Sequence, residues 1–429
     1  MTATARDVEV DTTVWRERGD PLVRATSTGP LAGHTVAVKD LFAVAGYPIG
    51  AGVEDFLAER TPEPRHAAVV ADLLAAGATI TGIARTDEFA YSITGGNGRT
   101  GMPVNPAAPQ CVPGGSTSGP AVAVARGEAT IGLGTDTAGS IRVPGSYQGL
   151  WGIRTTHASL DTTGLLPLAP SFDTIGWLTR DPATLFAVAD VLITNTVVPQ
   201  NKNAVARIDI GRSPVGRDPE VGQGAAATDS EHTGLRAGEL VVDPALCGAA
   251  EPGVAERSLL AAEELGARPI TLRADLDRWF SAFRAVQAFE AWAGHGEWLT
   301  AHPGALEPEV GERFAWAATV TAEQATAART VVVEAAVRIR GTIGDRVLVL
   351  PTTAGPPPLR EADQRTRDAV RGATLRLTCL ASIAGLPAVT LPLPDRHGLP
   401  VGLCLVGAAN TDRALIHLAT RCAARLANL

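Results

Sequence analysis

Lysine is almost absent from this chain of 429 residues. The 37 basic residues include only two lysines, Lys39 and Lys202, and all the others are arginines. A lysine can lose its proton inside a protein, whereas an arginine cannot. The lysine kept within the apolar run HTVAVKDLF therefore suggests that Lys39 supplies an amine that must become neutral. The alternative is an ordinary solvated lysine at the end of a strand.

Cysteine is also scarce, and no metal-binding or nucleotide-binding motif occurs. The five cysteines are scattered without CxxC spacing, which argues against a disulfide framework and a zinc site and indicates small buried side chains. The patterns GxxxxGK, HExxH and GxSxG are missing, so nucleotide-loop, zinc-peptidase and nucleophile-elbow chemistry have no support. We expect no metal site and no cofactor.

Long apolar runs and basic runs are missing too. No window of about 18 apolar residues could cross a bilayer, and the N-terminal MTATARDVEVD lacks the basic and apolar parts of a secretory signal. The net charge is −8 without a basic cluster, which weighs against a nucleic-acid partner. We therefore expect a cytoplasmic protein with no membrane partner.

Glycine and serine are concentrated in one stretch, residues 114–144, with the sequence GGSTSGPAVAVARGEATIGLGTDTAGSIRVP. It holds Ser116 and Ser118 in one Gly-rich turn and Ser140 in another. Glycines let a substrate approach main-chain N–H groups closely, and such groups can bind a developing oxyanion. The stretch thus favours a serine nucleophile, although Gly/Ser turns can also simply punctuate loops.

The motif GGSTSG, followed 24 positions after Ser116 by the serine of GTDTAGSIRVP, resembles the amidase signature family. The resemblance implies amide hydrolysis by a Ser, cis-Ser, Lys triad. Position by position, it makes Ser140 the nucleophile, Ser116 the bridging serine with a cis peptide, and Lys39 of VAVKD the base. Thr117 and Pro120 depart from the usual pattern, but neither change removes a reacting group.

The resemblance also implies how the substrate is held. Backbone N–H groups of Thr137, Ala138, Gly139 and Ser140 would form the oxyanion hole. Gly114, Gly115 and Tyr91 would contact the substrate. Triad and turn supply every group that amide hydrolysis needs, so the reaction requires no cofactor.

Over residues 31–195 the likeness is greatest to plant-type indole-3-acetamide hydrolases, which implies a small aryl- or alkyl-acetamide as substrate. An acylurea hydrolase resembling allophanate hydrolase and a carbamate hydrolase remain alternatives. Another is a tRNA amidotransferase subunit, which would need a partner chain. A non-enzymatic alternative is an inert amidase-fold scaffold. We expect the protein to act as a monomer or homodimer.

Four other residues near the serines have separate hypotheses. His157 is the histidine nearest Ser140 in sequence and is the candidate base of a conventional Ser-His-Asp triad. Arg142 and Asp136 flank the Ser140 turn closely enough to form an ion pair that holds it. Asp173 is expected to brace a loop.

Alternating helix and strand patterns predict one α/β domain over residues 1–429, with a large mixed β-sheet core covered by helices on both faces, as the resemblance implies. Residues 1–30 are expected to be weakly ordered, with Trp15 anchoring a short helix, and residues 195–238 to form a polar surface insertion. Other expected elements are a strand ending at Lys39, helices at 67–76, 182–192 and 412–427, strands at 79–83 and 346–351, and closing strands within 374–394 and 399–406.

Overall fold

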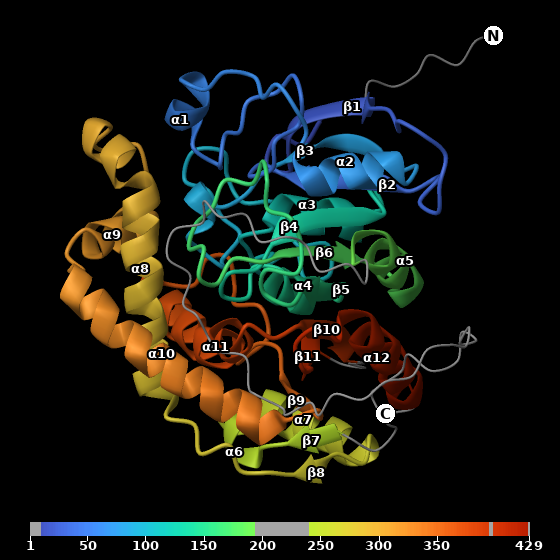
Figure 1. The fold of residues 1–429 in the computed structure, drawn as a ribbon, viewed down its shortest axis with the longest axis vertical. Coiled ribbons are helices and arrows are strands. Elements are labelled where there is room, and N and C mark those ends of the chain that lie inside the picture. Colours follow the sequence, from blue (N-terminus) through green and yellow to red (C-terminus); the bar gives the residue numbers. More distant parts are fainter. Residues whose placement is uncertain (1–9, 194–239, 394–397, 428–429) are drawn as a thin grey trace, which may run out of the picture.

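The computed structural model describes residues 10–193, 240–393 and 398–427. The strands of these residues form a single mixed sheet of eleven strands in the order β1-β3-β2-β4-β6-β5-β10-β11-β9-β7-β8 (Figure 1). The strands are β1 Trp15–Val23, β2 Thr35–Lys39, β3 Thr79–Ala84, β4 Ile131–Thr135, β5 Trp151–Arg154, β6 Ile175–Thr179, β7 Leu240–Val242, β8 Arg268–Pro269, β9 Val347–Pro351, β10 Ala388–Leu393 and β11 Val401–Val406.

Strand β2 lies between β3 and β4 and is parallel to both, with Val38 paired to Leu133 of β4. Three of its five residues are β-branched, and it is fully buried beyond its first residue, as expected for a central parallel strand. Because parallel strands end at the same edge of a sheet, Lys39 and Thr135, the last residues of β2 and β4, come to lie near each other. Ligand sites of α/β sheets form at such an edge.

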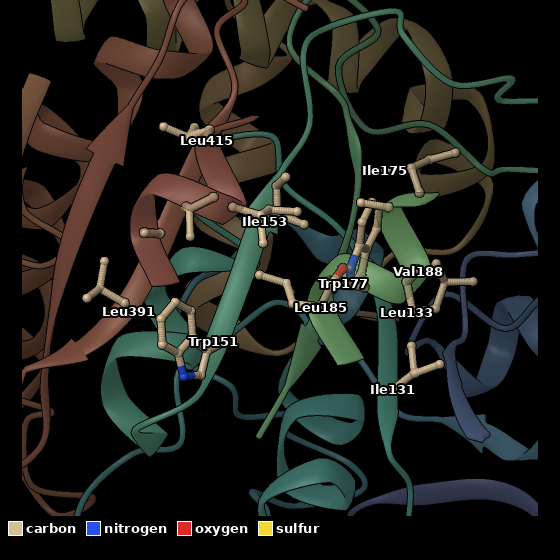
Figure 2. Close-up of a cluster of buried hydrophobic side chains, with 14 of the residues drawn as sticks. Ile131, Leu133, Trp151, Ile153, Ile175, Trp177, Leu185, Val188, Leu391 and Leu415 are labelled. Atoms are coloured by element: carbon tan, nitrogen blue, oxygen red, sulfur yellow. Dashed lines mark hydrogen bonds between the residues drawn. The ribbon is translucent and has the colours of Figure 1, made fainter. Parts of the chain in front are cut away.

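One face of the sheet is covered by a hydrophobic cluster beneath four helices. Apolar residues at every second position of β4, β5 and β6 share this face, and Leu185 and Val188 of α5 and Leu415 of α12 pack on them (Figure 2). The helices are α2 Ala68–Ala75, α5 Pro182–Leu192, α7 Pro252–Glu264 and α12 Asp412–Leu426.

The opposite face carries α3 and α4, which follow the two serine turns, and a second cluster formed with a group of helices from the C-terminal half. These later helices pack against one another beside the sheet (Figure 1). The helices of this face are α3 Ser118–Ala125, α4 Arg142–Gln148, α8 Leu276–Ala301, α9 Pro308–Ala317, α10 Ala322–Ile343 and α11 Gln364–Ala384; the short elements are α1 Glu54–Ala58, the 3-10 turn η1 Glu88–Ala90 and α6 Pro244–Cys247.

The prediction for the N-terminal segment was wrong from residue 10 onward. Trp15 begins the edge strand β1, which pairs antiparallel with β3, and no helix forms there. The Trp15 side chain is buried and donates a hydrogen bond to Glu128 at 2.6 Å. Pairing with the otherwise open edge of β3 outweighs the polar composition of this segment.

The closing strand expected within 374–394 occupies only the end of this range, as β10. Residues 374–384 belong to α11, whose buried side chains include Leu377, Leu380 and Ile383 at helical spacing. Gly385, with φ of 63°, ends the helix in the left-handed conformation, and the strand begins three residues later. The predicted insertion at 195–238 lies outside the described residues.

Within the described ranges, no helix has the length and apolar character needed to span a membrane.

Candidate active site

Lys39 ends β2 with its side chain fully buried. Its Nζ donates hydrogen bonds to Ser116 Oγ at 2.8 Å, Thr135 Oγ1 at 2.9 Å and Thr117 Oγ1 at 3.2 Å. All three acceptors are neutral hydroxyls. Among the described residues, the amine therefore has no carboxylate as a direct hydrogen-bond partner.

These surroundings lower the pKa of the Lys39 amine from 10.5 to about 7. Burial is the main cause, because it disfavours the charged ammonium. The more distant carboxylates of Asp87, Asp136 and Asp173 act in the opposite direction without reversing the shift. Near neutral pH a large share of the amine is thus unprotonated and able to accept a proton.

Ser116 reaches Lys39 because its turn lies tightly against β4. The peptide bond between Gly115 and Ser116 is cis, and the Ser116 carbonyl accepts a hydrogen bond from Thr86 Oγ1 at 2.8 Å. A Cβ on Gly134 of β4 would overlap the side chain of Thr117. Glycine at this strand position therefore permits the close approach that places Ser116 and Thr117 over the lysine.

Ser140 lies in the turn between β4 and α4 and lines a small pocket. The Thr117 N–H donates to the Ser140 carbonyl at 3.2 Å, which ties the two serine turns together through the main chain. Among the described residues, the hydroxyls of Ser140 and Ser116 form no hydrogen bond with each other. The structure thus places Lys39, Ser116 and Ser140 on or beside two linked turns.

The N–H groups of Thr137, Ala138 and Ser140 form no hydrogen bond with another described residue, and all three residues line the pocket. Gly139 differs, since its N–H donates to Asp136 Oδ1 at 2.8 Å. The expectation that Gly139 contributes to an oxyanion hole is therefore corrected, because its donor is already used. Three of the four expected donors remain available to a ligand.

Asp136 holds this turn in shape, and its predicted pairing with Arg142 is confirmed. Arg142 Nη2 lies 2.8 Å from Asp136 Oδ1, and Arg154 Nη1 lies 3.3 Å from the same oxygen. Burial alone would raise the pKa of Asp136, but the two guanidinium groups outweigh it and keep the pKa well below its usual range. The carboxylate therefore stays charged and also accepts the N–H of Ile141.

Two further contacts brace the turn. Asp173 accepts a hydrogen bond from Thr137 Oγ1 at 2.6 Å and from the N–H groups of Leu168 and Ala169, so its predicted bracing role is confirmed. Thr378 of α11 donates to the Ala138 carbonyl at 2.5 Å. The turn is thus fixed from both halves of the chain.

The pocket beside Ser140 is small and narrow. Tyr91 lines it as expected, whereas Gly114 and Gly115 do not line it, and their N–H groups donate to the carbonyls of Thr94 and Ile93. A larger hollow of about 870 Å³ lies beside β1 and β3, and none of the candidate residues lines it. The pocket residues are Ala90, Tyr91, Ser92, Ile93, Thr137, Ala138, Ser140, Leu168, Gln287, Arg371 and Leu375.

His157 does not line this pocket; its Nε2 lies 2.9 Å from the Pro170 carbonyl, and its N–H donates to Gly385. The geometry therefore gives no support to His157 as the base. Within the described residues, no cluster of three or more His, Cys, Asp or Glu side chains could hold a metal ion.

Sequence reasoning missed several residues of this site. Thr135 contacts the lysine, and its place in the GTDTAGS motif was the signal that could have identified it. Gln287 and Arg371 line the pocket from α8 and α11. Nothing in their local sequence marks them, because only the fold brings them beside Ser140.

Comparison with known proteins identifies relatives of this chain. The chain matches the family model described as Amidase over residues 15–272. It is 34% identical over 407 residues to Amidase 1 of Arabidopsis thaliana, covering 93% of this chain and 95% of that protein, and 33% identical over 400 residues to Amidase 1 of Oryza sativa subsp. japonica, covering 91% and 89%. A solved structure described as a crystal structure of amidase superimposes with a TM-score of 0.77 at 28% identity, covering 93% of this chain and 86% of that one. The matched segment 15–272 contains Lys39, Ser116 and Ser140 and ends before α8.

Proposed function

This chain belongs to the amidase signature family, and from that premise we propose that it hydrolyses a small primary carboxylic amide through a covalent acyl-enzyme at Ser140. That it is an amidase follows from the family. The triad, the acyl-enzyme and the substrate are the finer parts of the proposal. The observation that carries it is the buried Lys39 amine, with a pKa of about 7, hydrogen-bonded to Ser116 beside the pocket that Ser140 lines.

In the first half of the reaction, neutral Lys39 accepts the proton of Ser116 Oγ while Ser116 accepts the proton of Ser140 Oγ. The Ser140 oxygen forms a bond to the carbonyl carbon, and the electron pair of the C=O bond moves onto oxygen. The free N–H groups of Thr137, Ala138 and Ser140 are the donors for this oxyanion. Substrate binding would close the contact between the two serines, since catalytic hydrogen bonds often tighten only in the substrate complex.

In the second half, the oxyanion collapses and the C–N bond breaks. The leaving nitrogen takes a proton back through Ser116 from the Lys39 ammonium and departs as ammonia. Water then attacks the Ser140 ester with the same two groups acting as base, and the acid is released. The sum is one amide and one water converted into one carboxylate and one ammonium ion, with no electrons gained or lost.

Two kinds of rival function remain to be separated. An acylurea or a carbamate would pass through the same acyl-enzyme, so only a substrate comparison distinguishes them from a carboxylic amide. An inert scaffold would have no need for an unprotonated lysine beside free oxyanion donors. The presence of both the lysine and these donors therefore favours an enzyme over an inert scaffold.

The test combines a covalent probe with a substrate panel. Purified protein is treated with a fluorophosphonate, and the modified residue is located by peptide mass spectrometry, with the expectation of a single label on Ser140. Ammonia release is then measured for arylacetamides, alkylacetamides, an acylurea and a carbamate. A label on Ser116 or Ser118 would overturn the assignment of the nucleophile. Ammonia release from only the acylurea or only the carbamate would show that the substrate is not a carboxylic amide.

A further inference from the structure

One wall of the Ser140 pocket carries a guanidinium group. Arg371 of α11 lines the pocket together with Ser140, Thr137 and Ala138. The remaining lining is mainly small or aliphatic, including Ile93 and Leu375. A positive charge therefore shares a small pocket with Ser140.

This guanidinium has no hydrogen-bond partner among the described residues. Arg371 is half-buried, but its Nε is enclosed and unpaired. On the same helix, Arg367 is paired with Glu309 at 2.8 Å and Arg376 with Asp277 at 2.7 Å. Arg371 is the arginine of α11 that lines the pocket.

The electrostatic surroundings of Arg371 make an anion favourable there. Burial lowers the pKa of Arg371 to about 9, and the nearby charge of Arg313 adds to the effect. Arg284 acts in the same direction, whereas Tyr91 and Asp368 raise the pKa without reversing the shift. A half-buried cation whose enclosed Nε has no hydrogen-bond partner is costly, and a bound carboxylate would offset that cost.

Gln287 supplies a second polar group to this part of the pocket. It belongs to α8, is 7% exposed, and forms no side-chain hydrogen bond within the described residues. Its amide N–H groups can donate to a carboxylate oxygen, and the guanidinium can donate two parallel hydrogen bonds. Two helices from outside the matched family segment thus supply unused donors to one site.

We propose that Arg371 and Gln287 form a carboxylate subsite, so that the substrate is the monoamide of a small dicarboxylic acid whose free carboxylate binds there while its amide meets Ser140. The proposal rests on the proposed amide hydrolysis and specifies its substrate class. The leaving group of a primary amide is ammonia, which offers nothing to recognise, so selectivity must come from the acyl part. The reaction converts the monoamide and water into a dicarboxylate and an ammonium ion.

The experiment compares pairs of substrates that differ only in charge. Succinamate is paired with 4-methylpentanamide, and glutaramate with 5-methylhexanamide, because an isopropyl group has nearly the shape of a carboxylate. Values of kcat/KM are measured for the wild type, Arg371→Met, Arg371→Lys and the control Arg376→Met. The control removes a guanidinium from the same helix that is already paired and does not line the pocket.

We expect the wild type to favour at least one charged amide over its neutral partner. Arg371→Met should lower kcat/KM for that charged amide by about 100-fold or more, as for the loss of one partner of a buried charge pair. The neutral amide should change by no more than about threefold, and the control should leave both within that range. Arg371→Lys should recover part of the selectivity, since it keeps the charge without the planar fork.

A binding measurement keeps the proposal testable if turnover is slow. Calorimetry with Ser140→Ala should detect succinamate or glutaramate binding, which Arg371→Met in the same background should abolish. Equal activity of the wild type on charged and neutral amides would overturn the subsite and leave the proposed hydrolysis intact. An equal loss on both substrates in Arg371→Met would also overturn it, because the residue would then only support the fold. If the wild type hydrolyses no amide and Ser140 takes no acyl group, the result contradicts the proposed hydrolysis itself and not only the subsite.

Discussion

Lys39 and Asp136 are both completely buried, yet their surroundings have opposite effects on their charge. The lysine amine contacts only hydroxyl groups, so burial lowers its pKa to about 7. The aspartate contacts two guanidinium groups and several N–H groups, so its pKa falls and the carboxylate remains ionised. A buried charge with a strong counter-charge acts as a structural support. A buried charge without one becomes a group that can exchange a proton.

Ser140 connects these two sites, because Asp136 shapes its turn and the proposed mechanism passes its proton toward Lys39. We expect Ser140→Ala to lower turnover by at least about 10⁴-fold, because only the oxyanion donors and substrate binding would survive. The change removes one hydroxyl, so the melting temperature should stay near that of the wild type. Single-turnover assays with the preferred amide, combined with thermal denaturation, give both results. Substantial activity in this variant would mean that another group is the nucleophile.

Lys39→Arg tests whether the lysine site needs a neutral amine. Arginine keeps the positive charge and cannot release its proton, so we expect a loss of about 10³-fold in kcat/KM, the scale of a missing general base. Lys39→Met, which fills the space without a charge, should be equally inactive. His157→Ala serves as the matched test of the alternative base and should retain activity. Activity retained by Lys39→Arg and lost by His157→Ala would reverse the assignment.

Asp136→Asn tests whether the ion pairs of Asp136 with Arg142 and Arg154 support the structure. It would leave Arg142 and Arg154 buried with only a neutral partner, so we expect a destabilisation of about 3–5 kcal/mol, measured by denaturant unfolding. Displacement of the Ser140 turn should also lower kcat/KM by about 100-fold. The fluorophosphonate labelling rate should fall with it, because that rate reports the geometry of the turn. Unchanged stability in this variant would show that the ion pairs of Asp136 do not stabilise the turn.

The opposite pKa shifts of Lys39 and Asp136 predict the pH dependence of the reaction. Below a pH of about 7 the Lys39 amine is protonated and cannot accept a proton, so kcat/KM should fall about tenfold per pH unit toward acid. Asp136 stays ionised throughout this range and should add no step. A pH profile from 5 to 9 measures the acid limb. An acid limb with its midpoint near the ordinary pKa of lysine would contradict a lowered pKa for Lys39.

Thr135→Val should have the smallest effect of these substitutions, because it should shift the pH profile while changing kcat little. It removes one hydroxyl acceptor from the Lys39 ammonium, and losing a hydrogen bond to the charged form lowers the pKa of the amine further. The acid limb should therefore move to lower pH by about one unit, with kcat at pH 8 changed by less than about tenfold. Thr130→Val, which alters a hydroxyl outside the site, is the control and should leave the profile unchanged. A limb that moves to higher pH would mean that this hydroxyl does not stabilise the ammonium.

The sequence was sufficient to predict the parts of the site that lie in local motifs. Lys39 stood out because arginine replaces lysine nearly everywhere, and Ser116 and Ser140 because glycine surrounds them. The donation of the Gly139 N–H to Asp136 could not be predicted, since the motif does not show which N–H groups the turn uses for itself. Arg371 is separated from Ser140 by most of the C-terminal half of the chain, and only packing of α11 brings it into the pocket.

The fold was predictable to a similar extent and for similar reasons. Buried strands such as β2 and β9 and helices such as α5 and α12 have clear periodicity within themselves. Strand β1 exists because β3 offers an edge to pair with, which is information from another part of the chain. The order of the eleven strands likewise depends on pairings between distant segments.

The division of the pocket between two parts of the chain has a consequence for how the protein can change. The lysine, both serines and the N–H donors come from residues 39–140, whereas Gln287 and Arg371 come from helices α8 and α11. Substitutions in those helices can alter what is recognised while the contacts between Lys39 and Ser116 stay the same. If the proposed roles hold, the reacting groups and part of the substrate-recognising groups can vary independently, and side-chain exchanges on two helices can adapt the same reacting groups to a different acyl group.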